Sequence, residues 1–330
     1  MGIARHAHAP IATPPEQPPQ LTDRARAAFA ADVRDGLTRA PLSLPSRWLY
    51  DDVGSALFEA ITALDEYPLT RAEERIIARN VSELADRAPR RPIVVELGAG
   101  SGRKTGRIVE AVRAPLYVPI DVSAAALAAC TRTIGELTRV TAIEDDYLRG
   151  LSRALEGRED GEPALVLFLG STIGNFDRDD AAAFVAQIRD ALRPGDAFLL
   201  AADLVKSAAQ IVLAYDDPTG VTAAFDRNVL ARINRELDGD LDLRAFRHEA
   251  RWDAAERRVE MHLVATRPIS ARIPGAGIDL RMERGQSIWT ESSHKWHEPE
   301  LVALGEAAGF THVASWRDDA WPFVEALFAV

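Results

Sequence analysis

Cysteine is almost absent from this chain of 330 residues. The single cysteine, Cys130, excludes an intramolecular disulfide and a metal site built from several cysteines, and it favours a reducing cytoplasm as the location. No run of about 18 apolar residues occurs, so we expect no transmembrane helix. Residues 1–20 lack the continuous apolar stretch of a signal peptide, and their Pro and Ala content predicts a disordered tail. His6 and His8 lie in that tail, where two histidines seldom make a site, so no metal is expected.

Positive charge is also scarce. The chain has 39 Lys and Arg against 50 Asp and Glu, which gives a formal net charge of −11. Such a balance repels phosphate groups, so we expect neither nucleic acid nor a membrane surface as a partner. The expected partner is a small molecule, and we expect the protein to act as a monomer.

Four short apolar runs end in glycine or polar residues, and helical segments separate them. The runs cover residues 90–102, 111–123, 161–176 and 195–205. Continuous apolar runs alternating with helices predict a parallel sheet that is covered on both faces, in a doubly wound α/β fold. Ligands of such folds bind outside the carboxyl ends of the strands, where all four runs become small or polar.

The pattern changes from about residue 208 onward. A long amphipathic stretch is followed by segments that alternate with a period of two, which predicts antiparallel strands and hairpins. Near the amino terminus, Thr70 and Glu73 have the spacing of a capping box at the start of a helix. We expect a sheet domain with an inserted antiparallel module. The predicted boundaries are a tail over 1–20, N-terminal helices over 21–70, the sheet domain over 71–205, the insertion over 206–297 and a return to the sheet over 298–330.

A glycine-rich loop follows the first apolar run. Gly98, Gly100 and Gly102 come directly after Glu96, in the order E-x-G-x-G-x-G. A dinucleotide site would have G-x-G-x-x-G instead, with a helix start facing a pyrophosphate. An acid beside the glycines suits a cationic ligand without phosphate, so the pattern favours S-adenosyl-L-methionine. A turn that binds no ligand is the alternative.

Acidic residues also stand at the ends of the next runs. Asp121 lies about twenty residues after the glycines, where a carboxylate can accept hydrogen bonds from ribose hydroxyls. A role as helix cap competes with this, although Ser123 can cap the helix instead. Asp146 and Tyr147 end another expected strand, where they could meet an adenine; the local pattern leaves this open.

The third run ends in LGSTIGNF, residues 169–176, over the centre of the expected sheet. Asn175 offers both a donor and an acceptor there, which suits the carboxylate or amine of an amino acid, and Gly170 lies beside it. A turn with Asn in the left-handed conformation is the alternative.

The segment SIWTESSHKW, residues 287–296, has the alternation of a strand. Glu291, Ser293 and Lys295 are then expected on one face, with Trp289 on the same face and His294 on the other. Glu291 can accept from one imidazole nitrogen and Ser293 can bond the second. An edge strand with solvated polar residues is the alternative, and Lys295 either pairs with an acid or is solvated.

Five segments together resemble the histidine Nα-methyltransferases of ergothioneine biosynthesis. The resemblance runs from about Leu44 to the end of the chain, in the same order and at similar spacing. The segments are SRWLYDDVGSALFEAITALDEYPLTRAEE, the E-x-G-x-G-x-x-x-K-T loop, LGSTIGNF, AYDDPTGVTAAFDRNVLARINREL and WTESSHKW. The resemblance implies a Rossmann-like class I methyltransferase sheet and a second, smaller α+β domain that binds the substrate. It also implies S-adenosyl-L-methionine as co-substrate and three methylations of the α-amino group of L-histidine, to give hercynine.

Site residues follow from the same resemblance. The family's cofactor positions match Gly98, Gly100, Lys104, Asp121, Asp146 and Tyr147. Positions that hold the substrate carboxylate and amine match Asn175 and Tyr215, with Gly170 beside them. The imidazole end matches Tyr67, Glu291 and Ser293, and the pocket walls match Tyr50, Phe58 and Met261. No acid–base residue is expected, and Tyr50 and Asn175 would orient the amine. One departure is that the family often has E-Y-Y-P-T-R where residues 66–71 are EYPLTR.

Three other functions remain as alternatives. The same fold could methylate another amino acid or an imidazole derivative, although Glu291 and Ser293 favour imidazole over indole. A nicotinamide-dependent oxidoreductase would need G-x-G-x-x-G and a general acid, and neither is found. A binding protein without activity is the third.

Overall fold

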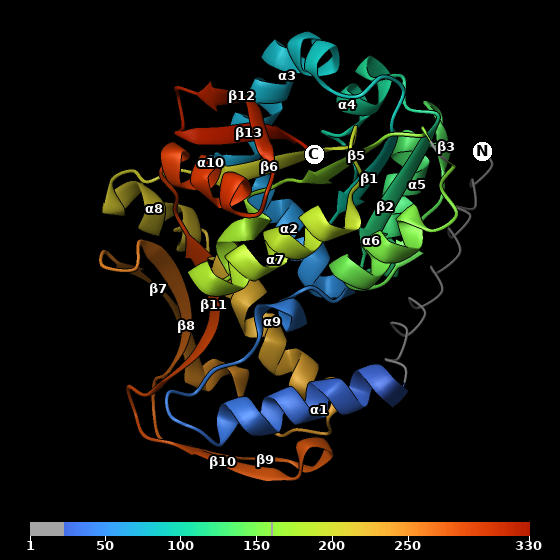
Figure 1. The fold of residues 1–330 in the computed structure, drawn as a ribbon. Helices are drawn as coiled ribbons and strands as arrows, with labels where there is room; N and C mark the ends of the chain where they lie inside the picture. The colour runs from blue at the N-terminus through green and yellow to red at the C-terminus, as the bar shows by residue number, and fades with distance from the viewer. Residues whose placement is uncertain (1–22, 160) are drawn as a thin grey trace, which may run out of the picture.

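An eight-stranded sheet forms the centre of the larger part of the molecule (Figure 1). The computed structural model describes residues 23–159 and 161–330, so the expected tail with His6 and His8 lies outside it. The strand order is β12-β13-β6-β5-β1-β2-β3, with β4 also paired to β2. The strands are β1 Ile93–Leu97, β2 Leu116–Asp121, β3 Arg139–Val140, β4 Ile143–Glu144, β5 Ala164–Phe168, β6 Ala197–Asp203, β12 Thr311–Asp318 and β13 Phe323–Ala329.

Strands β1 to β6 of this sheet pair in parallel, as their continuous apolar runs predict. The closing hairpin differs, because β13 runs antiparallel to β6 and β12 antiparallel to β13. A short turn between β12 and β13 is compatible only with antiparallel pairing, since parallel neighbours need a long crossover. The expected α/β fold is therefore confirmed, with a mixed edge.

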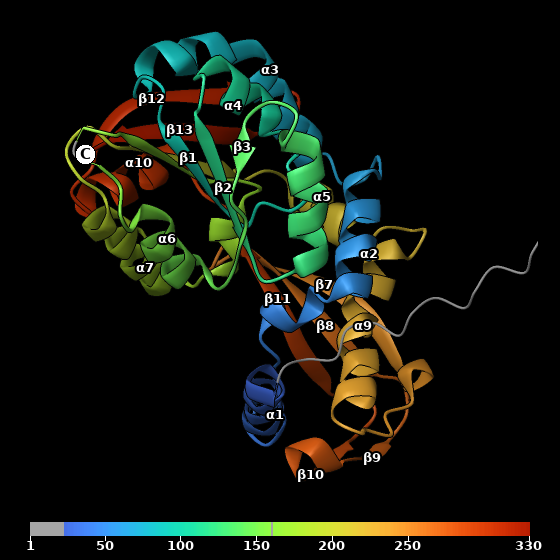
Figure 2. The same cartoon turned by 90° about the vertical axis from the view of Figure 1, so that its right-hand side faces the viewer.

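Helices cover both faces of the sheet, and alternate residues of one strand enter two separate cores. Val94 packs with one group of helices and Val95 with the other, and both are fully buried. Figure 2 shows α5 on one side of β1 and β2, and α6 and α7 on the other. The first face carries α3 Leu69–Arg87, α4 Gly106–Ala111 and α5 Ala124–Ile134; the second carries α6 Tyr147–Leu155, α7 Arg178–Ala191 and α10 Glu298–Ala307.

A second group of elements lies beside and below the large sheet in Figure 1, with α8 at the side and β7 to β11, α9 and α1 below. It contains a three-stranded antiparallel sheet in the order β11-β8-β7 and the hairpin β9–β10, which confirms the antiparallel strands predicted from the period of two. The division of the chain into domains stays a prediction. The elements are α1 Asp23–Leu37, η1 Ser46–Leu49, α2 Asp52–Thr62, α8 Ala208–Tyr215, α9 Val221–Glu236, η3 Leu243–Ala245, β7 Phe246–Asp253, β8 Arg258–Ala265, β9 Ile269–Ile273, η4 Pro274–Ala276, β10 Ile278–Met282 and β11 Ser287–His294.

The predicted capping box is wrong. Helix α3 begins at Leu69, after Pro68 at the cap position, so Thr70 is already inside the helix and caps nothing. Glu73 is fully buried rather than at the helix surface. The Thr–x–x–Glu spacing therefore does not mark a cap here; Glu73 is a buried acid that bonds the Gly170 backbone and Lys104.

A β-bulge in β11 overturns the expected position of Trp289. Trp289 pairs with His262 and Glu291 with Met261, so Thr290 is an extra residue between two paired positions. Paired residues share a face, and His262 and Met261 face opposite ways, so Trp289 and Glu291 do too. The Trp289 ring accordingly stacks on the His262 ring, with the Arg258 guanidinium 4.6 Å from its centroid.

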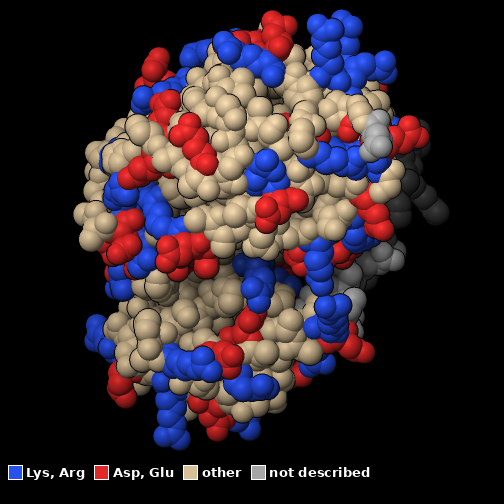
Figure 3. Space-filling model, in the orientation of Figure 1, with Lys and Arg blue, Asp and Glu red and all other residues tan. Residues whose placement is uncertain are grey.

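None of the described helices is long and apolar enough to cross a bilayer. Figure 3 shows Lys and Arg interspersed with Asp and Glu over the face seen in Figure 1. The described residues on that face form no large patch of one sign.

A buried ion pair fastens the amino end of β5. Both Asp196 oxygens accept from Arg158, at 2.7 and 2.8 Å, and Oδ1 also accepts from the Ala164 backbone at 2.8 Å. Both side chains are at most 3% exposed. We expect Asp196→Ala to lower the free energy of unfolding by about 3–5 kcal/mol, because it strands a buried guanidinium.

Chemical denaturation measures this loss. Asp35→Ala is the matched control, because it removes an acid paired with Arg39 at the surface. The control should change stability little. Equal losses in the two variants would contradict the role given to Asp196.

Candidate active site

One cavity of about 980 Å³ opens at the carboxyl ends of β1, β2 and β5, where it also meets β11. Every residue proposed above for the cofactor or the substrate lines it, although those residues are scattered over most of the chain. They are Tyr50, Phe58, Tyr67, Gly98, Gly100, Lys104, Asp121, Asp146, Tyr147, Gly170, Asn175, Tyr215, Met261, Glu291 and Ser293. Their individual roles stay predictions.

The glycine loop forms one end of this cavity. Gly98 and Gly100 have φ of 76° and 52°, a region that side chains with a Cβ rarely adopt. A Cβ on Gly100 would meet no atom within 4 Å, so the backbone lies open to the cavity. A Cβ on Gly98 would lie 3.4 Å from the Tyr147 hydroxyl. The loop thus offers bare backbone on which a ligand can rest.

Asp121 lies next to the loop at the end of β2. One oxygen accepts from the Gly100 backbone at 3.2 Å and the other from the Ser123 backbone at 3.0 Å. Ser123 caps α5 through its own hydroxyl, so Asp121 does not serve as that cap. Burial raises the pKa of Asp121, against the lowering effect of the backbone N–H groups. Asp146 differs, because it caps α6 by accepting from the Arg149 backbone at 2.9 Å.

Glu73 joins the two ends of the cavity, a role different from the capping box in which the sequence placed it. One oxygen accepts from the Gly170 backbone at 2.7 Å, and the other forms an ion pair with Lys104. Burial works against the Lys104 charge, but the Glu73 carboxylate raises the pKa of Lys104 above its usual value. Lys104 therefore stays charged beside the glycine loop. The sequence signal at Glu73 was its spacing from Thr70, and this spacing says nothing of a lysine 31 residues away.

Glu96 was expected to face a cationic ligand, and this is wrong. The side chain is fully buried behind the glycine loop, where it accepts from the Thr105 hydroxyl at 2.8 Å and from Tyr117. Burial raises the pKa of Glu96 to about 7. The acid of the E-x-G-x-G motif thus fixes the base of the loop rather than contacting a ligand.

Aromatic rings enclose the substrate end of the cavity. Tyr50, Phe58 and Phe225 lie in mutual contact, with ring centroids 5.3–6.0 Å apart. Phe58 also contacts Tyr67, and Tyr67 contacts Tyr215, at 6.2 and 6.0 Å. Phe225 was missed in the sequence, because a phenylalanine in an amphipathic helix is indistinguishable from a core residue.

Glu291 lies beside these rings. Its Oε1 accepts from the Tyr50 hydroxyl at 3.3 Å and from Asn175 Nδ2 at 3.2 Å. No described residue donates to Oε2, which is left for a ligand. Burial, reinforced by the nearby Asp226, raises the pKa of Glu291 to about 7. Asn175 was predicted at the amine end of the substrate, and here its amide also holds Glu291, the acid predicted for the imidazole end.

The second polar group of this end, Ser293, belongs to a buried chain of hydrogen bonds. Its hydroxyl accepts from the Tyr215 hydroxyl at 2.8 Å and from Lys295 Nζ at 2.9 Å. Lys295 is fully buried and forms an ion pair with Asp203 at 3.0 Å, so it has an acid partner and is not solvated. His294 lies on the opposite face, as predicted, with Nε2 3.3 Å from Asp177.

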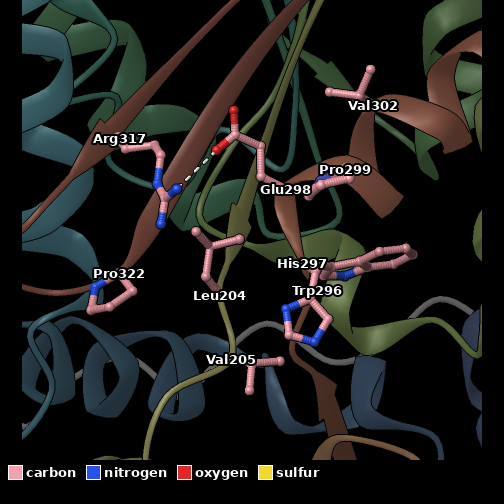
Figure 4. Close-up of a pocket in the computed structure, with 9 residues that line it drawn as sticks. All are labelled: Leu204, Val205, Trp296, His297, Glu298, Pro299, Val302, Arg317 and Pro322. Carbon is pink, nitrogen blue, oxygen red and sulfur yellow. Dashed lines mark ion pairs between the residues drawn. The ribbon is translucent and has the colours of Figure 1, made fainter.

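A smaller cavity of about 550 Å³ lies elsewhere, and Figure 4 shows the residues around it. Glu298 points toward Arg317 there, and the two form an ion pair at 3.3 Å. Its charged groups thus satisfy each other and its remaining walls are largely apolar, whereas the larger cavity keeps polar groups free. The larger cavity is the candidate active site.

Comparison with known proteins supports the same cavity. The model of a family described as "Histidine-specific methyltransferase, SAM-dependent" matches residues 29–330. The chain belongs to this family. The match covers both the large sheet and the antiparallel strands, so the resemblance inferred from five segments is confirmed over nearly the whole chain.

Individual relatives agree with the family. The chain is 41% identical to "Histidine N-alpha-methyltransferase" of Mycobacterium tuberculosis, over 93% of this chain and 96% of that protein. The protein of the same name from Mycolicibacterium smegmatis is also 41% identical, over 91% and 94%. "Ergothioneine biosynthesis protein 1" of Neurospora crassa is 31% identical over 84% of this chain but 32% of that protein.

The residues at the glycine loop fit the co-substrate of a histidine-specific methyltransferase. The bare backbone at Gly100, the Asp121 carboxylate and the Lys104 ammonium lie together in the cavity. The bare backbone allows a ligand to approach closely. The Asp121 carboxylate can accept from ribose hydroxyls, and the Lys104 ammonium can donate to a carboxylate. The loop faces no described cluster of acids and histidines that could hold a metal. S-adenosyl-L-methionine is the co-substrate of the family.

A buried histidine supports the substrate end of this methyltransferase from behind. His248 Nδ1 lies 2.7 Å from Asp226 and Nε2 lies 2.8 Å from the Tyr215 carbonyl. Both partners are acceptors, so the ring satisfies them only as an imidazolium. Burial lowers the pKa of His248, but the bonds to Asp226 and the Tyr215 carbonyl outweigh it and raise the pKa. Asp226 in turn accepts from Thr290, the bulge residue, at 2.5 Å.

The His248 imidazolium makes a pH-dependent contribution to stability. A folded-state pKa above that of an unfolded histidine gives a stabilisation that is complete below about pH 6.5 and lost as the pH rises through the folded value. We expect the stability difference between wild type and His248→Gln to be larger at about pH 5.5 than at about pH 8.5. Urea unfolding at both pH values measures it. A difference that grows with pH would show that His248 is buried neutral.

Proposed function

We propose that the protein transfers methyl groups from S-adenosyl-L-methionine to the α-amino nitrogen of L-histidine, three times, to give hercynine in ergothioneine biosynthesis. The observation that carries the proposal is the pair of polar groups on β11. Glu291 presents a free carboxylate oxygen and Ser293 a hydroxyl on the same face, within one cavity with the glycine loop.

An imidazole is the ring that matches this pair. Its two nitrogens lie on one small ring, one as a donor and one as an acceptor, and Glu291 and Ser293 can bond one each. A site built in this way rejects rings that lack either group, because the unmatched polar group stays buried without a partner. The aromatic walls supply the remaining contact area around the ring.

The chain's own task in the reaction is orientation and exclusion of water. S-adenosyl-L-methionine supplies a methyl group bound to a sulfonium. When the methyl is transferred, the sulfur is left as a neutral thioether. The α-amine attacks as the free base, so it must lose a proton before transfer. Lys104, Asp121 and the glycine loop would hold the co-substrate, while Asn175 and Tyr50 would orient the amine. Holding the reacting groups in line supplies several kcal/mol of the rate enhancement.

During three methylations the α-amine changes its chemistry while the residues around it stay the same. Each methyl removes an N–H, so hydrogen bonds give way to packing and to attraction between the cation and aromatic faces. The contacting rings of Tyr50, Phe58 and Phe225 offer such faces. The same wall therefore suits the amine early and the quaternary ammonium late.

The proposal is tested by incubating the protein with S-adenosyl-L-methionine and each amino acid in turn. Mass spectrometry should show gains of one, two and three methyl groups on histidine, with little reaction on the other amino acids. Tryptophan and phenylalanine test the selectivity most directly, because their rings are aromatic but lack the imidazole acceptor. Absence of methylated histidine would refute the proposal.

Removal of the Glu291 carboxylate should act on histidine rather than on the co-substrate. We expect Glu291→Ala to raise the KM for histidine about 10- to 100-fold, since a charge-assisted hydrogen bond is lost. The Kd for S-adenosyl-L-homocysteine, measured by calorimetry, should change by less than about twofold. Glu291→Gln, which keeps the shape and one acceptor, should lie between wild type and Glu291→Ala.

Asp121→Ala is the matched control for that experiment. Asp121 lines the glycine-loop end of the same cavity, so its loss should weaken S-adenosyl-L-homocysteine by about tenfold and histidine less. Equal effects of the two variants on both ligands would contradict the division of the cavity into two ends.

We also propose that the protein works in the cytoplasm as a monomer. The single cysteine supports the location: Cys130 is a free, buried thiol, and burial raises its pKa to about 12, so the thiol stays protonated. Size-exclusion chromatography with light scattering tests the monomer.

A further inference from the structure

Lys295 is the one lysine of the described chain that contacts two hydroxyls of the proposed substrate site. It is fully buried, one residue beyond the end of β11. Its Nζ lies 2.9 Å from the Tyr215 hydroxyl and 2.9 Å from the Ser293 hydroxyl, and it forms an ion pair with Asp203 at 3.0 Å. These are unusual surroundings for a side chain with no part in the chemistry, because burying an ammonium is costly.

Neutralising Asp203 does not require Lys295. Lys206 Nζ also donates to Asp203, at 2.5 Å, and the Trp321 indole N–H donates to the same oxygen at 2.9 Å. Asp203 would thus keep a cationic partner and a neutral donor without Lys295. Both of those donors meet Oδ1, so among the described contacts Lys295 alone approaches Oδ2 of Asp203, and it alone brings an ammonium to the two hydroxyls.

Those contacts determine where the hydroxyl protons point. A lysine ammonium donates and cannot accept, so neither hydroxyl can give its proton to Lys295. The Tyr215 hydroxyl donates to Ser293. Ser293 then accepts two hydrogen bonds, from Lys295 and Tyr215, which occupy both of its lone pairs. Its own proton has one direction left, into the cavity.

We propose that Lys295 is a positioning residue that makes Ser293 an obligate donor, so that the site takes histidine with a neutral imidazole ring and rejects the imidazolium. Neutral imidazole has one acceptor nitrogen to meet Ser293 and one N–H to meet Glu291. Imidazolium has two N–H groups, so one of them would face the Ser293 proton. This inference rests on the proposed function and specifies the form of the substrate that it uses.

Other titratable groups face the same region and must be separated from the substrate ring. Glu291 lies on β11, Asp226 on α9, Tyr67 just before α3, and Asp203 with Lys206 at the end of β6. Burial raises the pKa of Glu291 to about 7 and lowers that of Lys206 to about 8. Glu291 therefore titrates near the imidazole, and an experiment needs a ligand whose ring does not titrate.

The triazole analogue of histidine, 3-(1,2,4-triazol-3-yl)alanine, is that ligand. Its ring stays neutral over the range used and carries both an N–H and acceptor nitrogens. Calorimetry on the complex with S-adenosyl-L-homocysteine gives the Kd of each ligand at about pH 7.5 and about pH 5.5. Affinity for histidine should fall about tenfold at the lower pH, in step with the neutral fraction of imidazole. Affinity for the triazole should fall less than that for histidine, because only protein groups such as Glu291 titrate in that complex.

Lys295→Met tests the residue itself. It frees one lone pair on Ser293, which can then accept from an imidazolium N–H, so the loss of histidine affinity at low pH should shrink to about threefold or less. Lys206→Met is the matched control, because it removes the other ammonium on Asp203 without touching the hydroxyls. It should keep the tenfold loss.

Tyr215→Phe is the second test, for the case that Lys295→Met does not fold. It also frees a lone pair on Ser293, so it too should flatten the histidine profile, whatever its effect on overall affinity. A wild-type affinity for histidine that does not change with pH, or a triazole affinity that falls as steeply, would overturn the proposal. So would an unchanged tenfold loss in the folded Lys295 or Tyr215 variant. Failure of the proposed function has a different signature: histidine would not be methylated at any pH.

Discussion

The junction around Asp203 is the constraint on which the relation of the two sheets depends. Asp203 ends β6 of the large sheet, and Lys295 follows β11 of the antiparallel sheet. Backbone bonds reinforce the junction: the Trp296 N–H donates to the Asp203 carbonyl and the Val205 N–H to the Trp296 carbonyl, each at 3.0 Å. The end of the cavity that carries Glu291 and Ser293 is thereby fixed to the sheet that carries the glycine loop.

A second buried charge couples the co-substrate end to the substrate end. Glu73 holds the Gly170 backbone with one oxygen and Lys104 with the other. The lysine proposed for the co-substrate and the loop proposed for the amino acid thus share one carboxylate. Glu73 thus fixes the position of Lys104 relative to Gly170. A fixed spacing suits a reaction that depends on the alignment of two small molecules.

The sequence predicted the large sheet well, because a strand buried on both faces needs a nearly continuous apolar run; β5 has one, β6 has one up to Asp203, and β1 departs from it only at Glu96. The site residues were predicted from the resemblance to a known family. The structure places all of them around one cavity, which agrees with that prediction. Alternation could not predict the bulge at Thr290, since an extra residue leaves no compositional mark. The tasks of Glu73 and Glu96 were also hidden, because burial of an acid depends on partners distant in the sequence, such as Tyr117 and Lys104.

The bulge in β11 also decides which neighbours its side chains meet. With strict alternation, Trp289 would share a face with Glu291. The extra residue instead stacks the Trp289 indole on His262, and the Thr290 hydroxyl is held by Asp226. A single inserted residue thus lets an aromatic ring and a buried carboxylate occupy opposite faces of one strand at the edge of the same cavity.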